Sequence, residues 1–484
     1  MNRHRLAPGL ILVLSLGACA VGPDYRQPAM PHSPAFARAE ARTDDAPQLP
    51  VNDAEFWHAF GDPQLSELIA LSLAANHDLR IALARVDKDA AILRDVGLDR
   101  FPTVTASAQA GRERVSVYQS YGFPRTSRPF DASVNASWEI DLFGRVRRSI
   151  EAQRAEVAAS SADFQAMQIV IVGEVANVYV DLRGAQEQLS VALANVENQR
   201  ETLRIVGNRL DAGRGSNFDV VRARAQLEST QARVPALRVR IAVDQHRLAV
   251  LTGQSPAALI ADLDAPRPLP RIPEAIDPET PGELLRRRPD VAAAEERLHA
   301  ATARIGVATA DLYPRLSLGA MVGTFAFGPG AVFKSGSATN SIVLGVDWSF
   351  LDIGRVRARI AASDAEAEGL LAQFQQTVLR ALEDTENALV RFSRTRDEDA
   401  HLERAAAESA HAARLARARF QAGEISLYEV LDAERTQLRA QEAFADGRAR
   451  SATAAVALYR ALAGGWSQKL PQRDDLAAGS QGSR

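Results

Sequence analysis

The sequence predicts a mainly α-helical chain that also carries the strands of a membrane β-barrel. Four segments alternate apolar and polar residues, two amphipathic runs each continue without interruption for about 65 residues, and motifs of the first half recur in the second. Alternation with a period of two is typical of strands, and a seven-residue period over many turns is typical of long packed helices. With 484 residues, of which 46% are hydrophobic, the chain is long enough for a large core.

The N-terminus has the features of an export signal. Residues 1–18 combine a basic start with the apolar stretch "LILVLSLGA", which is too short to remain as a membrane-spanning helix. The sequence LGAC then ends at Cys19, the only cysteine, and resembles the lipobox of bacterial lipoproteins. The resemblance implies cleavage before Cys19 and acylation of that residue, and Ala20 in place of Asp implies export to the outer membrane. The alternative is an ordinary signal peptide followed by an incidental cysteine.

The body of the chain is a tandem duplication. Phe101 and Pro102 match Tyr313 and Pro314 at an offset of 212, and the motif GRVR recurs at an offset of 210. Proline-rich tracts separate the parts. We therefore expect a signal peptide at 1–18, a lipid-anchored extended arm at 19–60, a first repeat at 61–265, a linker at 266–281, a second repeat at 282–466 and a flexible tail at 467–484.

Each repeat is expected to contribute two strands, at roughly 103–112 and 129–142 and at roughly 315–325 and 341–352. The stretch from Phe130 to Leu142 is apolar at every even position and polar at the odd positions up to Asp141. Alone, such a window also fits a half-exposed strand of a soluble sheet. Four tilted strands of about ten residues match the thickness of a bilayer, but the smallest single-chain barrels use about eight strands. Several chains must then contribute to one barrel.

Two long helices are expected from Val146 to Asp211 and from Val356 to Gln421, rods of about 100 Å at 1.5 Å per residue. The first carries two heptad series of apolar residues, typical of coiled-coil seams: Ile150, Val157, Phe164, Ile171 and Val178, and Val175, Leu182, Leu189, Val196, Leu203 and Leu210. Gly213 and Gly423 predict sharp helix ends, each followed by a returning helix. Pro235 predicts a kink or break in the first returning helix, with no counterpart in the second repeat.

Nothing in the sequence favours an enzyme or a nucleic-acid-binding protein. The eight histidines are scattered, and the motifs HExxH, GxxxxGK and GxSxG are missing. The 57 basic and 60 acidic side chains nearly balance, without the excess of positive charge that nucleic-acid binding requires. We therefore predict no catalytic residues, no metal and no cofactor beyond a covalent lipid at Cys19.

The motifs "VGPDY", "RRRPDV", "GRVR" and "YEVLDAERT", in this order behind the lipobox, resemble the TolC-like outer-membrane efflux factors, in their lipoprotein branch of the OprM and NodT type. This resemblance covers nearly the whole chain. It implies a homotrimer in which four strands from each chain close a twelve-stranded outer-membrane β-barrel, continued by a long α-helical periplasmic tunnel. It also implies outer-membrane lipid, a periplasmic adaptor protein and an inner-membrane resistance-nodulation-division transporter as partners.

The same resemblance implies a gate at the periplasmic end of the tunnel. Glu429 and Asp432 match the acidic positions that narrow this end, where three chains would form carboxylate rings that favour cations. In the first repeat, Asp219 occupies the position equivalent to Glu429, but Arg222 stands where the second repeat has Asp432. A link from Arg222 to an acid would hold the gate closed. The alternative for Glu429 is a plain helix-stabilising acid in a first turn.

Two further sets of residues complete the expected sites. We expect adaptor docking at the turns, where small residues let partner helices approach closely: Gly213, Ser216, Gly423 and Ser426. Trp138 and Trp348 are expected to be barrel aromatics at the membrane interface.

The expected function is an exit channel of a tripartite efflux pump that exports drugs or other small toxic compounds. A duct for type I protein secretion is the second interpretation. A structural coiled-coil lipoprotein without a barrel is the third, and it explains the heptads and Cys19 but not the four alternating strands.

Overall fold

The computed structural model describes residues 20–30, 34–37, 56–122, 124–273, 276 and 280–463. The signal peptide, Cys19 and the tail at 467–484 lie outside the described residues. The chain forms two compact units, and each takes segments from both repeats. Unit 1 comprises the described residues of Met1–Ala29, Arg85–Ser161 and Ala293–Gln376, and unit 2 those of Met30–Ala84, Ala162–Ala292 and Thr377–Arg484.

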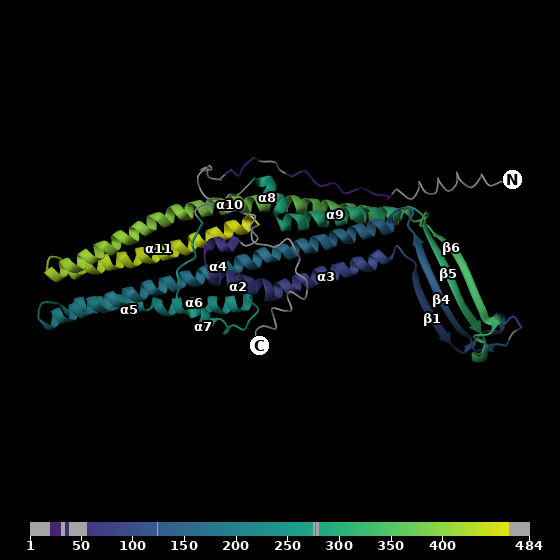
Figure 1. Cartoon of the computed structure of the whole chain (residues 1–484), viewed down its shortest axis with the longest axis horizontal. Coiled ribbons are helices and arrows are strands. Elements are labelled where there is room, and N and C mark those ends of the chain that lie inside the picture. The colour runs from purple at the N-terminus through teal and green to yellow at the C-terminus, as the bar shows by residue number, and fades with distance from the viewer. Residues whose placement is uncertain are drawn as a thin grey trace. The chain divides into compact units, whose positions relative to one another are not determined.

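The elements follow the expected order, helix, two strands, long helix and returning helix, in each repeat (Figure 1). The first repeat contains η1 (Phe56–Phe60), α2 (Pro63–Ala75), α3 (His77–Leu98), β1 (Thr103–Ala110), β2 (Glu113–Arg114), η2 (Val117–Gln119), β3 (Thr126–Ser127), β4 (Phe130–Ile140), α4 (Arg145–Asp211), α5 (Asn217–Gln231), α6 (Arg233–Leu251) and α7 (Ile260–Asp264). The second contains α8 (Pro281–Arg287), α9 (Pro289–Ala310), β5 (Arg315–Ala326), η3 (Pro329–Ala331), η4 (Ser335–Ser337), β6 (Ala338–Asp347), α10 (Ile353–Ala422) and α11 (Leu427–Ala461).

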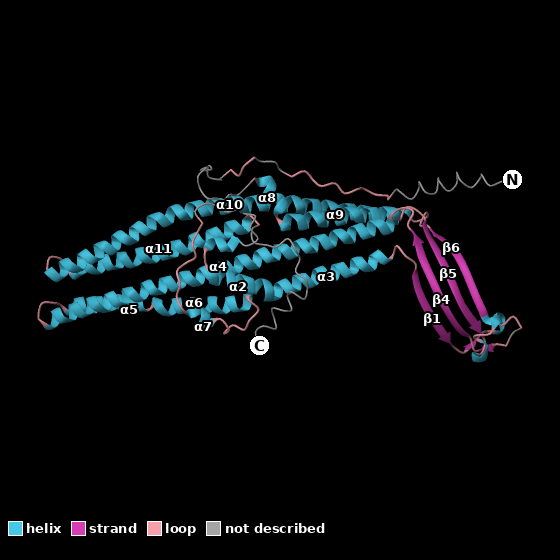
Figure 2. Ribbon diagram, in the orientation of Figure 1, coloured by secondary structure: helices cyan, strands magenta, loops and turns pink. Residues whose placement is uncertain are grey.

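Unit 1 is built on an antiparallel sheet in the order β1-β4-β5-β6 (Figure 2). Three strands lie close to their predicted ranges, but the last was predicted at 341–352 and occupies 338–347. Its partner β5 begins at Arg315, which pairs with Asp347, and the preceding Pro314 has no N–H to donate. Residues 348–352 therefore have no residues of β5 to pair with. The chain turns there, and the Asp352 amide donates to the Ser349 carbonyl at 2.9 Å.

The register gives this sheet two unequal faces. Its apolar face runs across all four strands and exposes large aliphatic side chains: Val104, Val134, Val322, Ile342, Leu344 and Val346. The opposite, polar face carries hydroxyl and amide groups that bond to one another: the Ser107 and Ser133 hydroxyls lie 3.0 Å apart, and Asn135 Nδ2 donates to Ser133 Oγ at 3.2 Å. The alternation predicted for β4 is therefore confirmed and continues through its neighbours, except that Met321, Phe325 and Val343 lie on the polar face.

Among the described residues, no helix is both long enough and apolar enough to cross a membrane. The helices are amphipathic instead, as the heptads predict. None of the eleven heptad positions of α4 is exposed, and those at Val175 and Leu182 are fully buried. Small residues let α4 and α11 approach each other closely within unit 2, since a Cβ placed on Gly184 of α4 would lie 2.8 Å from the Cβ of Ala449 on α11.

The predicted break at Pro235 is confirmed. Helix α5 ends at Gln231, Ala232 interrupts the helix, and α6 begins at Arg233 with the proline at its third position. Because Pro235 has no N–H, the carbonyl four residues earlier loses its helical donor. Helix α11, its counterpart in the second repeat, continues without interruption for 35 residues.

Candidate functional site

The turn between α4 and α5 and the turn between α10 and α11 each contain a glycine in the left-handed conformation. The angle φ is 68° at Gly213 and 82° at Gly423. The Gly213 amide donates to the Leu210 carbonyl at 2.9 Å, and the Gly423 amide to the Phe420 carbonyl at 3.0 Å. Residues with a Cβ adopt this conformation at a cost, so the glycines allow the tight ends of α4 and α10. The helix ends predicted from these glycines are confirmed.

The predicted docking residues all lie at the surface of these turns. Gly213, Ser216, Gly423 and Ser426 are exposed, and a Cβ placed on either of these two glycines would meet no atom within 4 Å. The turns thus present open backbone with small side chains. Adaptor docking there stays a prediction.

Glu429 acts within its own helix turn. It forms a capping box at the start of α11, in which the Ser426 amide donates to Glu429 Oε2 at 2.7 Å and the Ser426 hydroxyl bonds to the same oxygen. These bonds, the hydroxyl one first, lower the pKa of Glu429, so this exposed carboxylate is charged at neutral pH. The helix-stabilising role considered for Glu429 is present, and it leaves one carboxylate oxygen for a further contact.

The other two acids also have local partners. Asp432 Oδ1 lies 2.5 Å from Nη2 of Arg435 on the same helix. Asp219 Oδ2 accepts from the Ser216 hydroxyl at 2.8 Å, and its amide donates back to Ser216 Oγ at 3.2 Å. Each carboxylate is therefore held in a fixed direction near a turn. Whether three copies bring them into a ring stays a prediction.

Arg222 has a partner that the sequence interpretation missed. Its guanidinium lies 4.7 Å from the ring centroid of Tyr428, which joins α5 to the start of α11. In the described part of the chain, no ion pair includes Arg222, and its link to an acid stays a prediction. Cation–π contacts of this kind contribute about 0.5–1 kcal/mol at exposed sites. The sequence signal was an aromatic directly before Glu429.

Behind the turns lies a buried polar cluster that the sequence interpretation also missed. Thr202 of α4 donates to Glu434 Oε1 of α11 at 2.8 Å, and Arg417 of α10 brings its Nε to 3.4 Å from the same oxygen. Glu434 is 3% exposed, and burial raises its pKa. The burial of Glu434 was predictable from helical spacing, since it lies four residues from both Val430 and Leu438, which are on the buried face of α11.

Trp138 and Trp348 make equivalent bonds in the two repeats. The indole N–H of Trp138 donates to the Arg100 carbonyl and that of Trp348 to the Leu312 carbonyl, both at 3.0 Å. Each tryptophan thus fixes the helix-side end of its strand to the turn that follows α3 or α9. An indole whose polar atom is bonded and whose ring is partly exposed suits a membrane boundary.

The first described residues after Cys19 are anchored in unit 1. The Val21 amide donates to the Phe143 carbonyl at 3.1 Å, between β4 and α4. Asp24 Oδ1 pairs with the buried Arg148 at 2.6 Å, and the ring of Tyr25 stacks on His299 at 4.3 Å. The motif "VGPDY" therefore forms a specific seat at the junction of sheet and helices.

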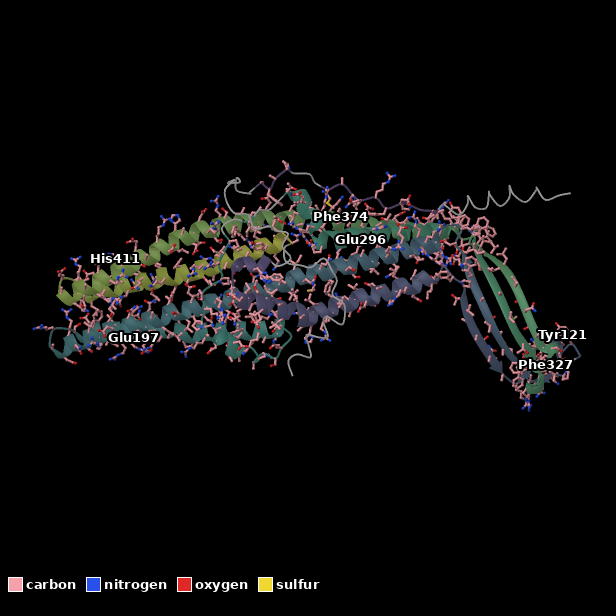
Figure 3. All side chains as sticks on the ribbon, viewed as in Figure 1. Tyr121, Glu197, Glu296, Phe327, Phe374 and His411 are labelled. Atoms are coloured by element: carbon pink, nitrogen blue, oxygen red, sulfur yellow. The ribbon has the colours of Figure 1, made fainter. Side chains whose placement is uncertain are left out.

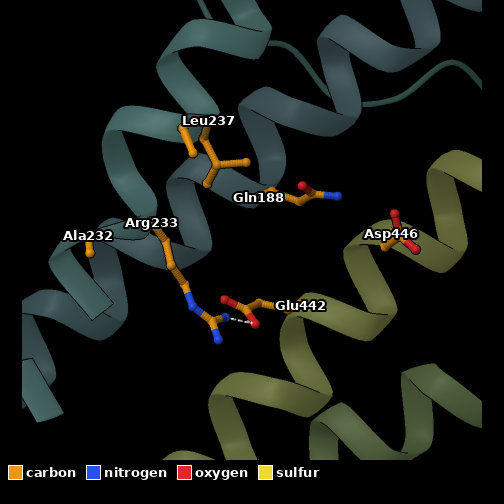
Figure 4. A pocket seen from close by; sticks show the side chains of 7 residues that line it. Gln188, Ala232, Arg233, Leu237, Glu442 and Asp446 are labelled. Atoms are coloured by element: carbon orange, nitrogen blue, oxygen red, sulfur yellow. Dashed lines mark hydrogen bonds and ion pairs between the residues drawn. The ribbon is translucent and has the colours of Figure 1, made fainter. Parts of the chain in front are cut away.

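A cavity of about 480 Å³ lies beside the helix break in unit 2. Arg233 of α6 forms an ion pair with Glu442 of α11 across it (Figure 4). This pair ties the interrupted returning helix to the continuous one. In the parts of the chain that the structure describes, no group of three or more metal-ligating side chains is assembled.

Comparison with known proteins gives consistent matches. The family described as "Outer membrane efflux protein" matches residues 68–254 and 280–464. The pyoverdine export outer membrane protein OpmQ of Pseudomonas putida is 33% identical, with 96% of this chain and 98% of the relative covered. The outer membrane protein OprJ of Pseudomonas aeruginosa is 31% identical over 95% of each chain. The solved structure of the outer-membrane channel OprN is 40% identical with a TM-score of 0.84, covering 93% of this chain and all of OprN.

Proposed function

Because this chain belongs to the outer membrane efflux protein family, we propose that three copies of it form the exit channel of a tripartite pump, which exports drugs or other small toxic compounds across the outer membrane. The chain is an outer-membrane efflux protein and not an enzyme. The observation that carries the proposal is the sheet of unit 1, whose apolar face continues across all four strands while the other face is polar.

Closure of a barrel follows from the edges of that sheet. Its outer strands are β1 and β6, of 8 and 10 residues, and among the described residues each pairs on one side only. An unpaired strand edge cannot be left in lipid, because its amide and carbonyl groups would lack partners. Pairing β1 of one copy with β6 of the next satisfies these groups, and three copies close a ring of twelve strands.

The height of the sheet fits the membrane. Strand β4 has 11 residues, and at about 3.3 Å per residue and a tilt of about 40° it rises about 28 Å, close to the apolar band of such barrels. The apolar face then meets lipid and the polar face lines water. Helix α4 has 67 residues, about 100 Å at 1.5 Å per residue, and would line a tunnel on the periplasmic side.

The seat of the motif "VGPDY" supports a lipid anchor at Cys19. Val21 is bonded to Phe143, where β4 leads into α4, so a lipid two residues earlier would lie near the inner leaflet of the outer membrane. Buried acyl chains contribute about 0.8 kcal/mol for each methylene. The mature protein should take up radioactive palmitate, and the Cys19→Ser chain should not. Label that persists in the variant would exclude this anchor.

The substrate class rests on the relatives. Their names refer to small molecules, among them pyoverdine for OpmQ and antibiotics or toluene for others. Such channels work with a periplasmic adaptor and an inner-membrane resistance-nodulation-division transporter, which we propose as partners here. No feature of the structure favours type I protein secretion over this role.

Deletion of the gene in its own cell tests the proposal. The deletion should raise accumulation of a fluorescent dye and lower the tolerated drug concentration, and the wild-type gene should restore both. The opposite result, unchanged dye and drug responses with loss of a secreted protein from the medium, would favour protein secretion.

A further inference from the structure

The loop between β1 and β4 concentrates positive charge. Residues 111–129 contain four arginines against a single acid, Glu113. All four arginines are exposed, and none forms an ion pair with a described residue. They are Arg112, Arg114, Arg125 and Arg128. Elsewhere in unit 1 arginines do find carboxylates, as Arg145 does with Glu139 at 2.6 Å. Arg125 donates only its Nε, to the Val115 carbonyl at 3.4 Å, so the loop arginines keep most of their donors for a further partner.

A short hairpin fixes two of these arginines opposite each other. Strands β2 and β3 pair Glu113 with Ser127, and the Gly111 amide donates to the Pro129 carbonyl at 3.0 Å. This register places Arg112 directly across from Arg128. Like charges in facing positions destabilise a strand pair unless an anion lies between them. The hairpin thus holds two guanidinium groups where one anionic group can bind both.

These two arginines line a cavity of about 740 Å³ that also has apolar walls. Tyr121, Pro124 and Phe327 contribute rings to it. Tyr121 and Phe327 lie at the end of the strands away from α3 and α9 (Figure 3), and the exposed fraction of Tyr121 is 88%. Glu113 also lines the cavity, so two guanidinium groups and one carboxylate leave an excess of positive charge beside the ring faces, the combination that a phosphorylated sugar fits.

The position of the cavity along the sheet indicates which phosphate-bearing molecule lies next to it. Trp138 and Trp348 stand at the helix side of the sheet, and Phe130, which pairs with Ala110 and Ala326 on the apolar face, stands at its loop side. Aromatic side chains at both ends mark the two membrane boundaries. The arginines lie beyond the loop-side boundary, at the level of lipid headgroups. Since the long helices require the periplasm, that side is the outer leaflet.

We infer that the cavity lined by Arg112, Tyr121, Arg128 and Phe327 binds the phosphate-bearing headgroup of lipopolysaccharide. Arg112 and Arg128 hold one phosphate between them by paired N–H donors, the geometry that guanidinium provides. The rings of Tyr121 and Phe327 contact the sugar, and the acyl chains extend along the apolar face. This inference rests on the proposed function, because it requires the sheet to span an outer membrane.

Lipid binding by the purified trimer tests the inference. The probes are lipid A with two phosphates, the same lipid without phosphate, and inorganic phosphate, each measured by native mass spectrometry in detergent. The wild-type trimer should bind the phosphorylated lipid. The double variant Arg112→Glu/Arg128→Glu should lose about a hundredfold in affinity, about tenfold for each charge-assisted contact. The double lysine variant should bind with intermediate affinity, because it keeps charge without the paired donors.

The matched control reverses two exposed arginines on helices of the same unit, Arg94→Glu with Arg357→Glu, and should bind like the wild type. Equal binding of lipids with and without phosphate, or no loss in the Arg112→Glu/Arg128→Glu trimer, would overturn the inference. Inorganic phosphate that binds as tightly as the lipid would overturn its assignment to lipopolysaccharide. Ion conductance of the same trimers in a planar bilayer reports on folding and on the proposed function separately: a conducting trimer without lipid binding refutes only the inference.

Discussion

An arginine in place of Val134 tests which face of the sheet meets lipid. Val134 lies near the middle of β4, between Ala106 of β1 and Val322 of β5, and its side chain is 50% exposed on the apolar face. Its neighbour Ser133 points to the polar face and bonds to Ser107 at 3.0 Å. The two positions differ by one residue along the strand, so they have the same depth and opposite surroundings.

The expected costs follow from those surroundings. An arginine that faces lipid near the middle of a bilayer costs about 2–4 kcal/mol in a barrel. Val134→Arg should therefore destabilise a trimer by about 6–12 kcal/mol, since each chain contributes one such side chain. Ser133→Arg places its guanidinium in water and loses two hydrogen bonds, with Ser107 and Asn135, which at about 0.5 kcal/mol each cost about 1 kcal/mol per chain.

Urea unfolding of the trimer in liposomes measures this difference as the free energy of unfolding, and the yield of trimer in the outer membrane measures it in cells. Val134→Arg should shift the unfolding midpoint strongly and reduce the yield, whereas Ser133→Arg should change both only slightly. Equal damage from the two variants would refute the assignment of the faces and would indicate a sheet packed inside a soluble domain.

Three other changes test the gate, the turns and a half-buried acid. Replacing Glu429 and Asp432 together by alanine should weaken cation preference, measured as the reversal potential in a salt gradient. Glu429→Gln keeps the capping box and controls for helix stability. Unchanged selectivity in the double variant would place the gate elsewhere. Gly423→Val should abolish export while conductance persists, because it adds bulk and strains the left-handed backbone at an exposed turn, and normal export would exclude adaptor docking there. Burial, and secondarily Asp181, raises the pKa of Asp244 to about 6, so its contribution to stability is present below its ordinary pKa of about 4 and is lost as the pH rises through 6. The melting temperature of Asp244→Asn should therefore fall less than that of the wild type between pH 4 and 7, and parallel profiles would contradict this.

The long helices, their ends and the helix break were predictable because each depends on local chemistry. Heptad spacing determines which face of α4 is buried, Gly213 and Gly423 supply the left-handed residue that ends a helix, and Pro235 removes one donor. The end of the last strand was not predictable in the same way. Alternation continues to Phe350, but pairing stops where Pro314 limits the neighbouring strand.

The candidate gate shows the same division between local and non-local information. The places of Glu429 and Asp219 near the turns, and their bonds to Ser426 and Ser216, follow from capping preferences within one helix. The contact of Arg222 with Tyr428 depends on how α5 and α11 are rotated against each other. Sequence periodicity gives the buried face of each helix but not its rotation relative to a neighbour.

Single-channel recording in a planar bilayer tests the central claim, that several copies of this chain enclose a pore, most directly. The purified wild-type protein should insert as trimers and give discrete, uniform current steps that favour cations. Protein that remains trimeric and retains its helices and strands, yet gives no current steps at the same density in the bilayer, would contradict the channel.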